Sequence, residues 1–116
     1  MKKMILIGAA LLVLASSAVF AEEHADTALK HTQMAIEYGK AGHASVFIQH
    51  ADEALIHAKK AAEVAKGESK AHMDAAAISL QLAIEQAKIN GAGHLKAARE
   101  AAEEAEGHIK AGISDF

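Results

Sequence analysis

The chain has 116 residues, of which 12 are basic and 15 acidic, and its formal net charge is −3 with neutral histidines. This length supports one domain, and the absence of cysteine excludes disulfides and thiolate metal sites. The chain is negatively charged and has no basic clusters, which argues against binding to nucleic acid and against a polybasic membrane-binding surface.

Residues 1–21 have the pattern of a secretory signal peptide. Two lysines precede an apolar run, and small residues lead to Ala21. The apolar core falls short of the roughly 20 residues that a membrane-spanning helix needs. We expect cleavage after Ala21, with Ala18 as the alternative, and no stable membrane insertion of residues 22–116 after cleavage. These expectations place the protein in the periplasm or otherwise outside the cell.

The remaining segment is predicted to be entirely helical. It is rich in Ala, Glu, Lys, Leu and Ile, which favour helices, and it contains no proline. Glycine and Asn-Gly positions divide it, because such residues commonly follow a helix C-terminus. The predicted helices cover residues 22–38, 43–66, 68–89 and 94–112, the last with a flaw at Gly107. Ser69 is predicted to cap the third helix, and Glu22 and Glu23 suit the positive end of the first.

Small or apolar residues recur one, four and five positions after each heptad position that carries histidine. These offsets lie on one face of a helix and predict the core stripe of a bundle. We therefore expect an all-α fold, an antiparallel up-down-up-down four-helix bundle built from two helical hairpins in a single domain, residues 22–116. Met34 and Met73 are expected to fill its core. The predicted stripe in the first hairpin comprises Ala25, Ala28, Leu29, Ala35, Ile36, Ala44, Phe47, Ile48, Ala51, Ala54, Leu55, Ala58, Ala61 and Ala62.

Histidine recurs every seven residues in the predicted second helix. Seven residues advance a helix by about 10.5 Å, so these histidines cannot bind one ion through metal–nitrogen bonds of about 2 Å. In an antiparallel hairpin, however, residues that face each other have a constant sum of residue numbers. This rule pairs Tyr38 with His43, His31 with His50, and His24 with His57, and around the second turn Gln86 with His94 and His72 with His108. The spacing therefore predicts metal sites between neighbouring helices.

Carboxylates lie within reach of several of these histidines. Glu53 follows His50 by three residues and precedes His57 by four, so it is a candidate ligand beside either one. Glu104 stands in the same relation to His108. Two imidazoles with one carboxylate suit divalent copper, nickel, cobalt or zinc, and copper is favoured by the usual order of affinities.

Other functions find less support in the sequence. No nucleophile with a convergent base, phosphate-binding loop or zinc-protease motif is present, so we do not expect an enzyme. Noncovalent haem is disfavoured because aromatic residues are few. The alternative to metal binding is a metal-independent helical adaptor or stress protein that acts through protein contacts, with its histidines as spacers at the core edge. Tyr38 is expected to be a packing residue, the chain a monomer, and no protein partner is indicated.

The run "HADTALKHTQMAIEYGKAGHASVFIQHADEALIHAKKA" resembles the periplasmic small metal-binding protein family. Members repeat histidine every seven residues and carry a Gly-Lys-x-Gly-His turn, as in residues 39–43. The resemblance implies a four-helix bundle that binds several divalent metal ions, copper foremost, for buffering, scavenging or detoxification. The histidines that match the family pattern are His24, His31, His43, His50, His57, His72, His94 and His108. The chain departs from it at Tyr38, Val64, Ser79, Gln86 and Ala101, which implies fewer or weaker sites in the second hairpin.

Overall fold

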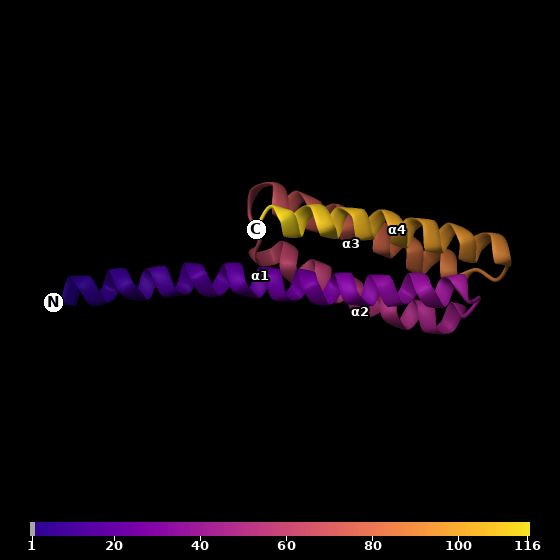
Figure 1. Ribbon diagram of the computed structural model, residues 1–116, viewed down its shortest axis with the longest axis horizontal. Coiled ribbons are helices and arrows are strands. Elements are labelled where there is room, and N and C mark those ends of the chain that lie inside the picture. Colours follow the sequence, from indigo (N-terminus) through magenta and orange to yellow (C-terminus); the bar gives the residue numbers. More distant parts are fainter. Residues whose placement is uncertain (1) are drawn as a thin grey trace.

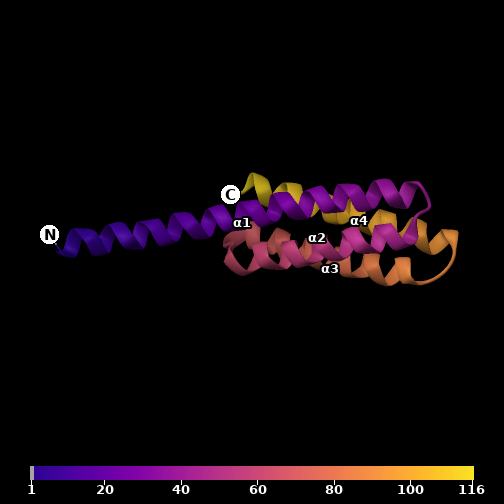
Figure 2. The ribbon, with the colours of Figure 1, turned by 90° about the horizontal axis from the view of Figure 1, so that it is seen from below.

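Four long helices make up the computed structural model, which describes the backbone of residues 2–116 and the side chains of residues 18–116. They are α1 (Lys2–Lys40), α2 (Ala44–Val64), α3 (Gly67–Lys88) and α4 (Ala92–Ser114). Consecutive helices run in opposite directions, and Figures 1 and 2 show them side by side in two views. The described part of the chain contains no strand. The predicted all-α antiparallel bundle is confirmed.

The bundle consists of two helical hairpins packed together. The most extensive contacts join α1 to α2 and α3 to α4, which are the two hairpins. Contacts of α2 with α3 and of α1 with α4 close the bundle, whereas α2 and α4 lie diagonally and barely touch. The turns after α1 and after α3 lie together at one end, where Gly42 and Gly91 line a common pocket and have positive φ angles of 83° and 125°.

The core is built mostly of alanine, as the stripe predicted. Ala25, Ala28, Ala54, Ala58 and Ala61 are fully buried and belong to one core cluster. Because alanine removes little apolar area from water, the few large buried side chains contribute a large share of the hydrophobic stabilisation. The largest fully buried side chains are Phe47, Met73, Leu80, Ile109 and Thr32. Met73 fills the core as predicted, but the same prediction for Met34 is wrong: it is 37% exposed because its position lies off the core face of α1.

Two glycines that were expected to mark helix ends lie inside helices instead. Gly39 belongs to α1, where an added Cβ would lie 3.0 Å from Cδ2 of Phe47. Gly112 belongs to α4, where an added Cβ would collide with Cε of Met73. Both glycines are therefore explained by the close approach of a neighbouring helix and not by helix termination. The helix also runs through Gly107 without a break.

The predicted end of α2 and the predicted cap of α3 are also wrong. Gly67, with a φ of 60°, is the first residue of α3 and not the end of α2, so Lys66 takes the N-cap position. Ser69 is buried inside α3, and its Oγ donates a hydrogen bond to the carbonyl of Gly112, 3.2 Å away. In the uncleaved chain Glu22 and Glu23 lie in the interior of α1, which begins at Lys2, so their place at the start of a helix after cleavage stays a prediction.

The N-terminal part of α1 bears on the predicted signal peptide. Residues 1–21 fall mostly outside the part of the chain whose side chains the structure describes. Of the residues next to the predicted cleavage point, Val19 and Phe20 are more than half exposed, whereas Ala21 is buried. None of the helices in the described residues is both long enough and apolar enough to span a membrane.

Replacing the largest core side chain should cost much of the stability. Phe47 is fully buried, and a Phe47→Ala substitution leaves a cavity that we expect to lower the free energy of unfolding by about 3–5 kcal/mol. Urea denaturation followed by circular dichroism measures this loss. Phe116→Ala removes the same atoms at a position that is 42% exposed, and it should change stability by no more than about 0.5 kcal/mol. Equal losses in the two variants would contradict this account of the core.

Candidate metal centre

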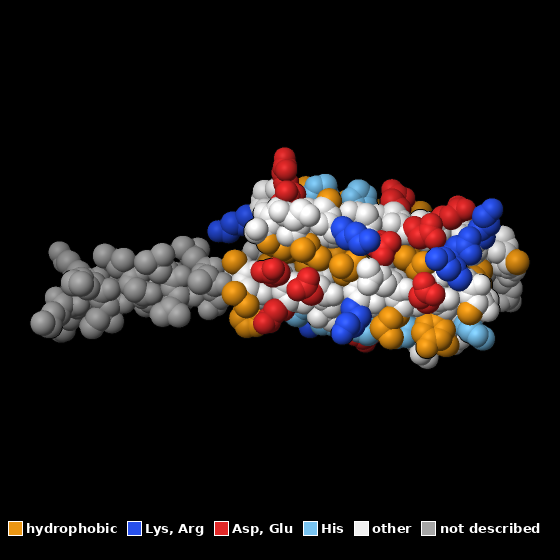
Figure 3. Space-filling view, viewed as in Figure 1, with side chains coloured by type: hydrophobic (Ala, Val, Ile, Leu, Met, Phe, Trp, Pro, Cys, Tyr) orange, Lys and Arg blue, Asp and Glu red, His pale blue; other side chains and the backbone are white. Residues whose placement is uncertain are grey.

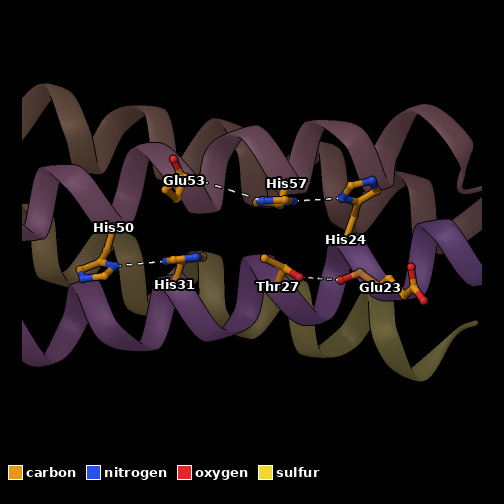
Figure 4. A network of polar contacts seen from close by, with 7 residues as sticks. All are labelled: Glu23, His24, Thr27, His31, His50, Glu53 and His57. Carbon is orange, nitrogen blue, oxygen red and sulfur yellow. Dashed lines mark hydrogen bonds and ion pairs between the residues drawn. The ribbon is translucent and has the colours of Figure 1, made fainter.

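Two pairs of histidines face each other between α1 and α2. Nδ1 of His24 lies 2.9 Å from Nδ1 of His57, and Nδ1 of His31 lies 3.1 Å from Nδ1 of His50. Figure 4 shows each pair with its rings pointing toward one another from the two helices. All four side chains are half-buried. The pairing predicted from the constant sum of residue numbers is confirmed in both cases.

The alanine core explains why these imidazoles can meet. Each histidine of the pairs precedes a buried alanine or threonine at the next position, namely Ala25, Thr32, Ala51 and Ala58. Each histidine consequently lies at the edge of the core, next to the buried face of its helix. Small side chains on that face let the backbones of α1 and α2 approach closely. The edges of the two helices then come near enough for short imidazole side chains to touch.

The nitrogen separations fit metal coordination. An ion bound to two nitrogens at about 2 Å, with the nitrogens this far apart, subtends an angle of about 90° to 100°, which matches adjacent positions of a square plane or an octahedron. A regular tetrahedral site would need the nitrogens about 3.3 Å apart. In the metal-free pair one Nδ1 donates a hydrogen bond and the other accepts it. A metal ion would displace that shared proton and lie to one side of the line between the two nitrogens, so both rings would have to turn toward it.

Glu53 approaches one pair from the side away from the facing nitrogens. Its Oε2 lies 3.9 Å from Nε2 of His57, while Nδ1 of the same ring faces His24 (Figure 4). A carboxylate near Nε2 favours the tautomer with its proton on that nitrogen, which leaves Nδ1 with a free lone pair. Glu53, predicted as a ligand beside either His50 or His57, thus contacts His57, and it lies where it can orient the ring.

The imidazoles belong to a longer row of stacked rings. The rings of His31 and His57 are nearly parallel, with centroids 6.4 Å apart, and so link the two pairs. Tyr38 stacks on His50 with a centroid distance of 5.5 Å and an interplanar angle of 8°. Tyr38 is 37% exposed, so it packs on the ring of His50 at the surface of the bundle and not in the core, and its ring limits the freedom of His50 to rotate.

The second hairpin brings together a looser pair. The ring centroids of His72 and His108 are 6.1 Å apart, so this predicted pairing is also confirmed. Here each Nε2 faces a carboxylate: Oδ2 of Asp115 lies 3.7 Å from His72, and Oε1 of Glu104 lies 3.9 Å from His108. The sequence pattern does not predict the contact with Asp115, because it places the helix end at Gly112. In the structure α4 continues to Ser114 and brings Asp115 next to His72.

The last two predicted ligands lie near the turns and are exposed. Nδ1 of His94 lies 3.0 Å from Oε1 of Gln86, and the ring of His43 meets the edge of Tyr38 at a centroid distance of 6.3 Å. Both contacts agree with the predicted register. Within the described residues, no group of three or more His, Cys, Asp or Glu side chains converges as a ready metal site. The facing histidines therefore come together as pairs, and an ion bound to one pair would need water or another ligand to complete its coordination.

Electrostatics favour the metal-binding form of one histidine. Burial lowers the pKa of His57 below its ordinary value of 6.5, and the positive charges of His24, Lys60 and His31 act in the same direction. Glu53 opposes them by raising the pKa. Because the net shift is downward, His57 is neutral at neutral pH, and neutral imidazole is the form that binds metal ions.

A family model described as small metal-binding protein matches residues 1–112, which is nearly the whole chain. The chain therefore belongs to the small metal-binding protein family. No curated protein matches it.

The metal-free protein should lose stability in mild acid. The pKa of His57 is lower in the folded chain than in the unfolded chain, so the unfolded chain binds more protons and stability falls as the pH drops through about 6.5. We expect the melting temperature, measured with a chelator present, to decline between about pH 7 and about pH 5. A His57→Gln substitution should flatten that decline, whereas His94→Gln, at an exposed position, should leave it unchanged. Identical pH profiles for both variants would refute the assignment to His57.

Proposed function

From membership in the small metal-binding protein family, we propose that this protein reversibly binds divalent transition-metal ions, copper foremost, at its histidine pairs. The observation that carries the proposal is the approach of two imidazole nitrogens to 2.9 Å and 3.1 Å in two successive pairs along one seam. His72 and His108 offer a third, wider pair, and a carboxylate lies near the Nε2 atom of each, Asp115 beside His72 and Glu104 beside His108. His43 and His94 each offer a single imidazole and bind weakly.

The donor set supports divalent copper as the preferred ion. The two close pairs offer neutral nitrogen donors, and the chain has no thiolate that would select softer ions. Divalent copper also stands highest among the first-row divalent ions in affinity for such ligands, and it adopts tetragonal geometry with adjacent ligands near 90°. Nickel, cobalt and zinc follow at higher concentrations. The carboxylates near His72 and His108 make the third site the better one for these ions.

The form of the sites supports a role in metal buffering, scavenging or detoxification. Each close pair supplies two protein ligands that are only half-buried, so water completes the coordination and gives incoming ligands access to the ion. Several such sites on a small chain would let it hold several ions reversibly, and not retain one ion permanently. Nothing in this arrangement recruits a substrate beside the metal, which fits a carrier of ions better than an enzyme.

Export is part of the proposal. The pattern of residues 1–21 supports a signal peptide that is removed after Ala21, which delivers residues 22–116 to the periplasm or the exterior. A chain without cysteine forms no disulfides there. Imidazole ligands also suit the divalent state of copper that prevails in an oxidising compartment.

Removal of one pair should abolish one site without unfolding the bundle. We expect a His31→Ala, His50→Ala double variant to bind one copper ion fewer than the parent in a calorimetric titration at neutral pH without a chelating buffer. The matched control is His43→Ala, His94→Ala, which removes the same number of histidines from exposed positions. His43 makes no side-chain capping bond, so the control should remain helical and retain the tight sites.

The alternative of a metal-independent adaptor makes the opposite prediction for the parent protein. If a helical, correctly processed chain takes up no copper stoichiometrically, the metal proposal fails. If both double variants lose equal amounts of copper, the proposal that pairs form the sites fails, because binding would then follow the number of histidines and not their placement.

Copper binding should weaken strongly in acid. Protons compete with the metal ion for both imidazoles of a pair, because only the neutral ring binds a metal ion. The apparent affinity should therefore fall roughly a hundredfold or more between pH 7 and pH 5. Titration at a series of pH values, with a competing chelator of known affinity, measures this dependence. Undiminished affinity at pH 5 would be incompatible with ligation by histidine pairs.

A further inference from the structure

Processing after Ala21 would place histidine at the third position of the new chain. We propose that Glu22, Glu23 and His24 then form an amino-terminal chelate for divalent copper or nickel, separate in kind from the histidine pairs. Its four nitrogens are the α-amine of Glu22, the amide nitrogens of Glu23 and His24, and Nδ1 of His24. The inference rests on the proposed export, and it adds a metal site that uses the backbone.

The chemistry follows from the position of histidine in the processed chain. Hydrolysis of the Ala21–Glu22 peptide bond by water leaves a carboxylate on Ala21 and a free amine on Glu22. With histidine at the third position, the amine, two amides and the imidazole can close three fused chelate rings around one ion in a plane. Binding releases one proton from each of the two amides and any proton on the amine. Square-planar nitrogen coordination is the geometry that divalent copper and nickel prefer.

Cleavage would also free the required amides from the helix. In α1 the backbone N–H groups of Glu22, Glu23 and His24 are bonded to carbonyls four residues earlier, in residues 18–20. Those carbonyls leave with the removed segment. The first amides of a helix have no intrahelical partner, so the two amides that chelation needs are among those that lose their acceptors. Deprotonation and metal binding then compete with water and not with a helical hydrogen bond.

The surroundings of these residues permit the first turn to unwind. Glu22 and Glu23 are exposed and His24 is only half-buried, whereas Ala25 is fully buried and is the first buried residue that remains once Ala21 has been removed. Figure 4 shows two side-chain bonds to this turn: an exposed one from Oγ1 of Thr27 to the carbonyl of Glu23 at 2.9 Å, and the contact of His24 with His57. The three residues can therefore fold around an ion without opening the core.

The chelate shares one atom with the neighbouring histidine pair. Nδ1 of His24, which the chelate needs, is the atom that faces Nδ1 of His57 at 2.9 Å. One ion can hold His24 in only one of the two arrangements, so the end of the α1–α2 seam has two metal-binding modes. The two modes differ in the metal ions that they select. Zinc has no electronic preference for square-planar coordination, so its binding energy in that geometry is too small to displace the amide protons. Copper and nickel can use both modes, and zinc only the pair.

The test uses the full chain, exported and processed by a bacterial host. Mass spectrometry of the purified protein should give Glu22 as the first residue. Titration with divalent nickel should then produce the yellow, diamagnetic complex of square-planar four-nitrogen coordination, at one ion per chain. The matched control inserts one alanine between Glu22 and Glu23, which preserves the cleavage point and moves His24 to the fourth mature position. This variant should lose the nickel spectrum.

A second variant tests the backbone directly. Glu23→Pro keeps histidine at the third position but removes one of the two amide protons, and proline is tolerated in the first turn of a helix. It should lose the nickel spectrum as well, while circular dichroism shows an intact bundle. Cleavage elsewhere, the absence of the spectrum in the parent, or its persistence in either variant would overturn the inference. Copper binding lost in the His31→Ala, His50→Ala variant reports on the proposed pairs separately, so the two proposals can fail independently.

Discussion

The close approach of α1 and α2 over an alanine face is the constraint on which the candidate site depends. Imidazole side chains are short, so Nδ1 atoms from two helices come within 2.9 Å and 3.1 Å only when the backbones are near one another. Fully buried Ala25, Ala28, Ala54 and Ala58 make that approach possible. The same alanines leave little apolar area to stabilise the fold. The geometry that brings the ligands together thus also makes the metal-free protein depend on a few large side chains such as Phe47.

The two hairpins use this architecture differently. Between α1 and α2, imidazole faces imidazole through Nδ1, and stacked rings hold the row together. Between α3 and α4, His72 and His108 stand farther apart, and their Nε2 atoms face Asp115 and Glu104. Figure 3 shows pale-blue histidine side chains at two opposite edges of the bundle, with acidic side chains close by. One edge therefore offers mainly nitrogen donors, and the other a mixture of nitrogen and oxygen donors that suits harder ions.

The sequence predicted the pairing well because antiparallel register is an arithmetic constraint. Once the glycine turns are located, the heptad fixes which residues share an edge, and His24 and His57 meet at the far end of the first hairpin as expected. The failures concern contacts between distant helices. Ser69 resembles a cap locally, yet it bonds to Gly112 across the bundle. Gly112 resembles a helix end, yet it makes room for Met73, and the continued helix brings Asp115 to His72. No local pattern distinguishes a glycine needed for close packing from one that ends a helix.

Proton and metal compete for the same atoms in this fold, and that competition links stability to function. Burial and neighbouring positive charges lower the pKa of His57, so the folded bundle favours the neutral ring that a metal ion requires. Protonation of both members of a pair would place two positive charges within hydrogen-bonding distance, at a seam that is half-buried. A divalent ion bound as proposed would put a comparable charge in the same place, but it would bind both lone pairs and thereby join the two helices. The arrangement that makes acid destabilising is therefore the one that makes a bound metal ion stabilising.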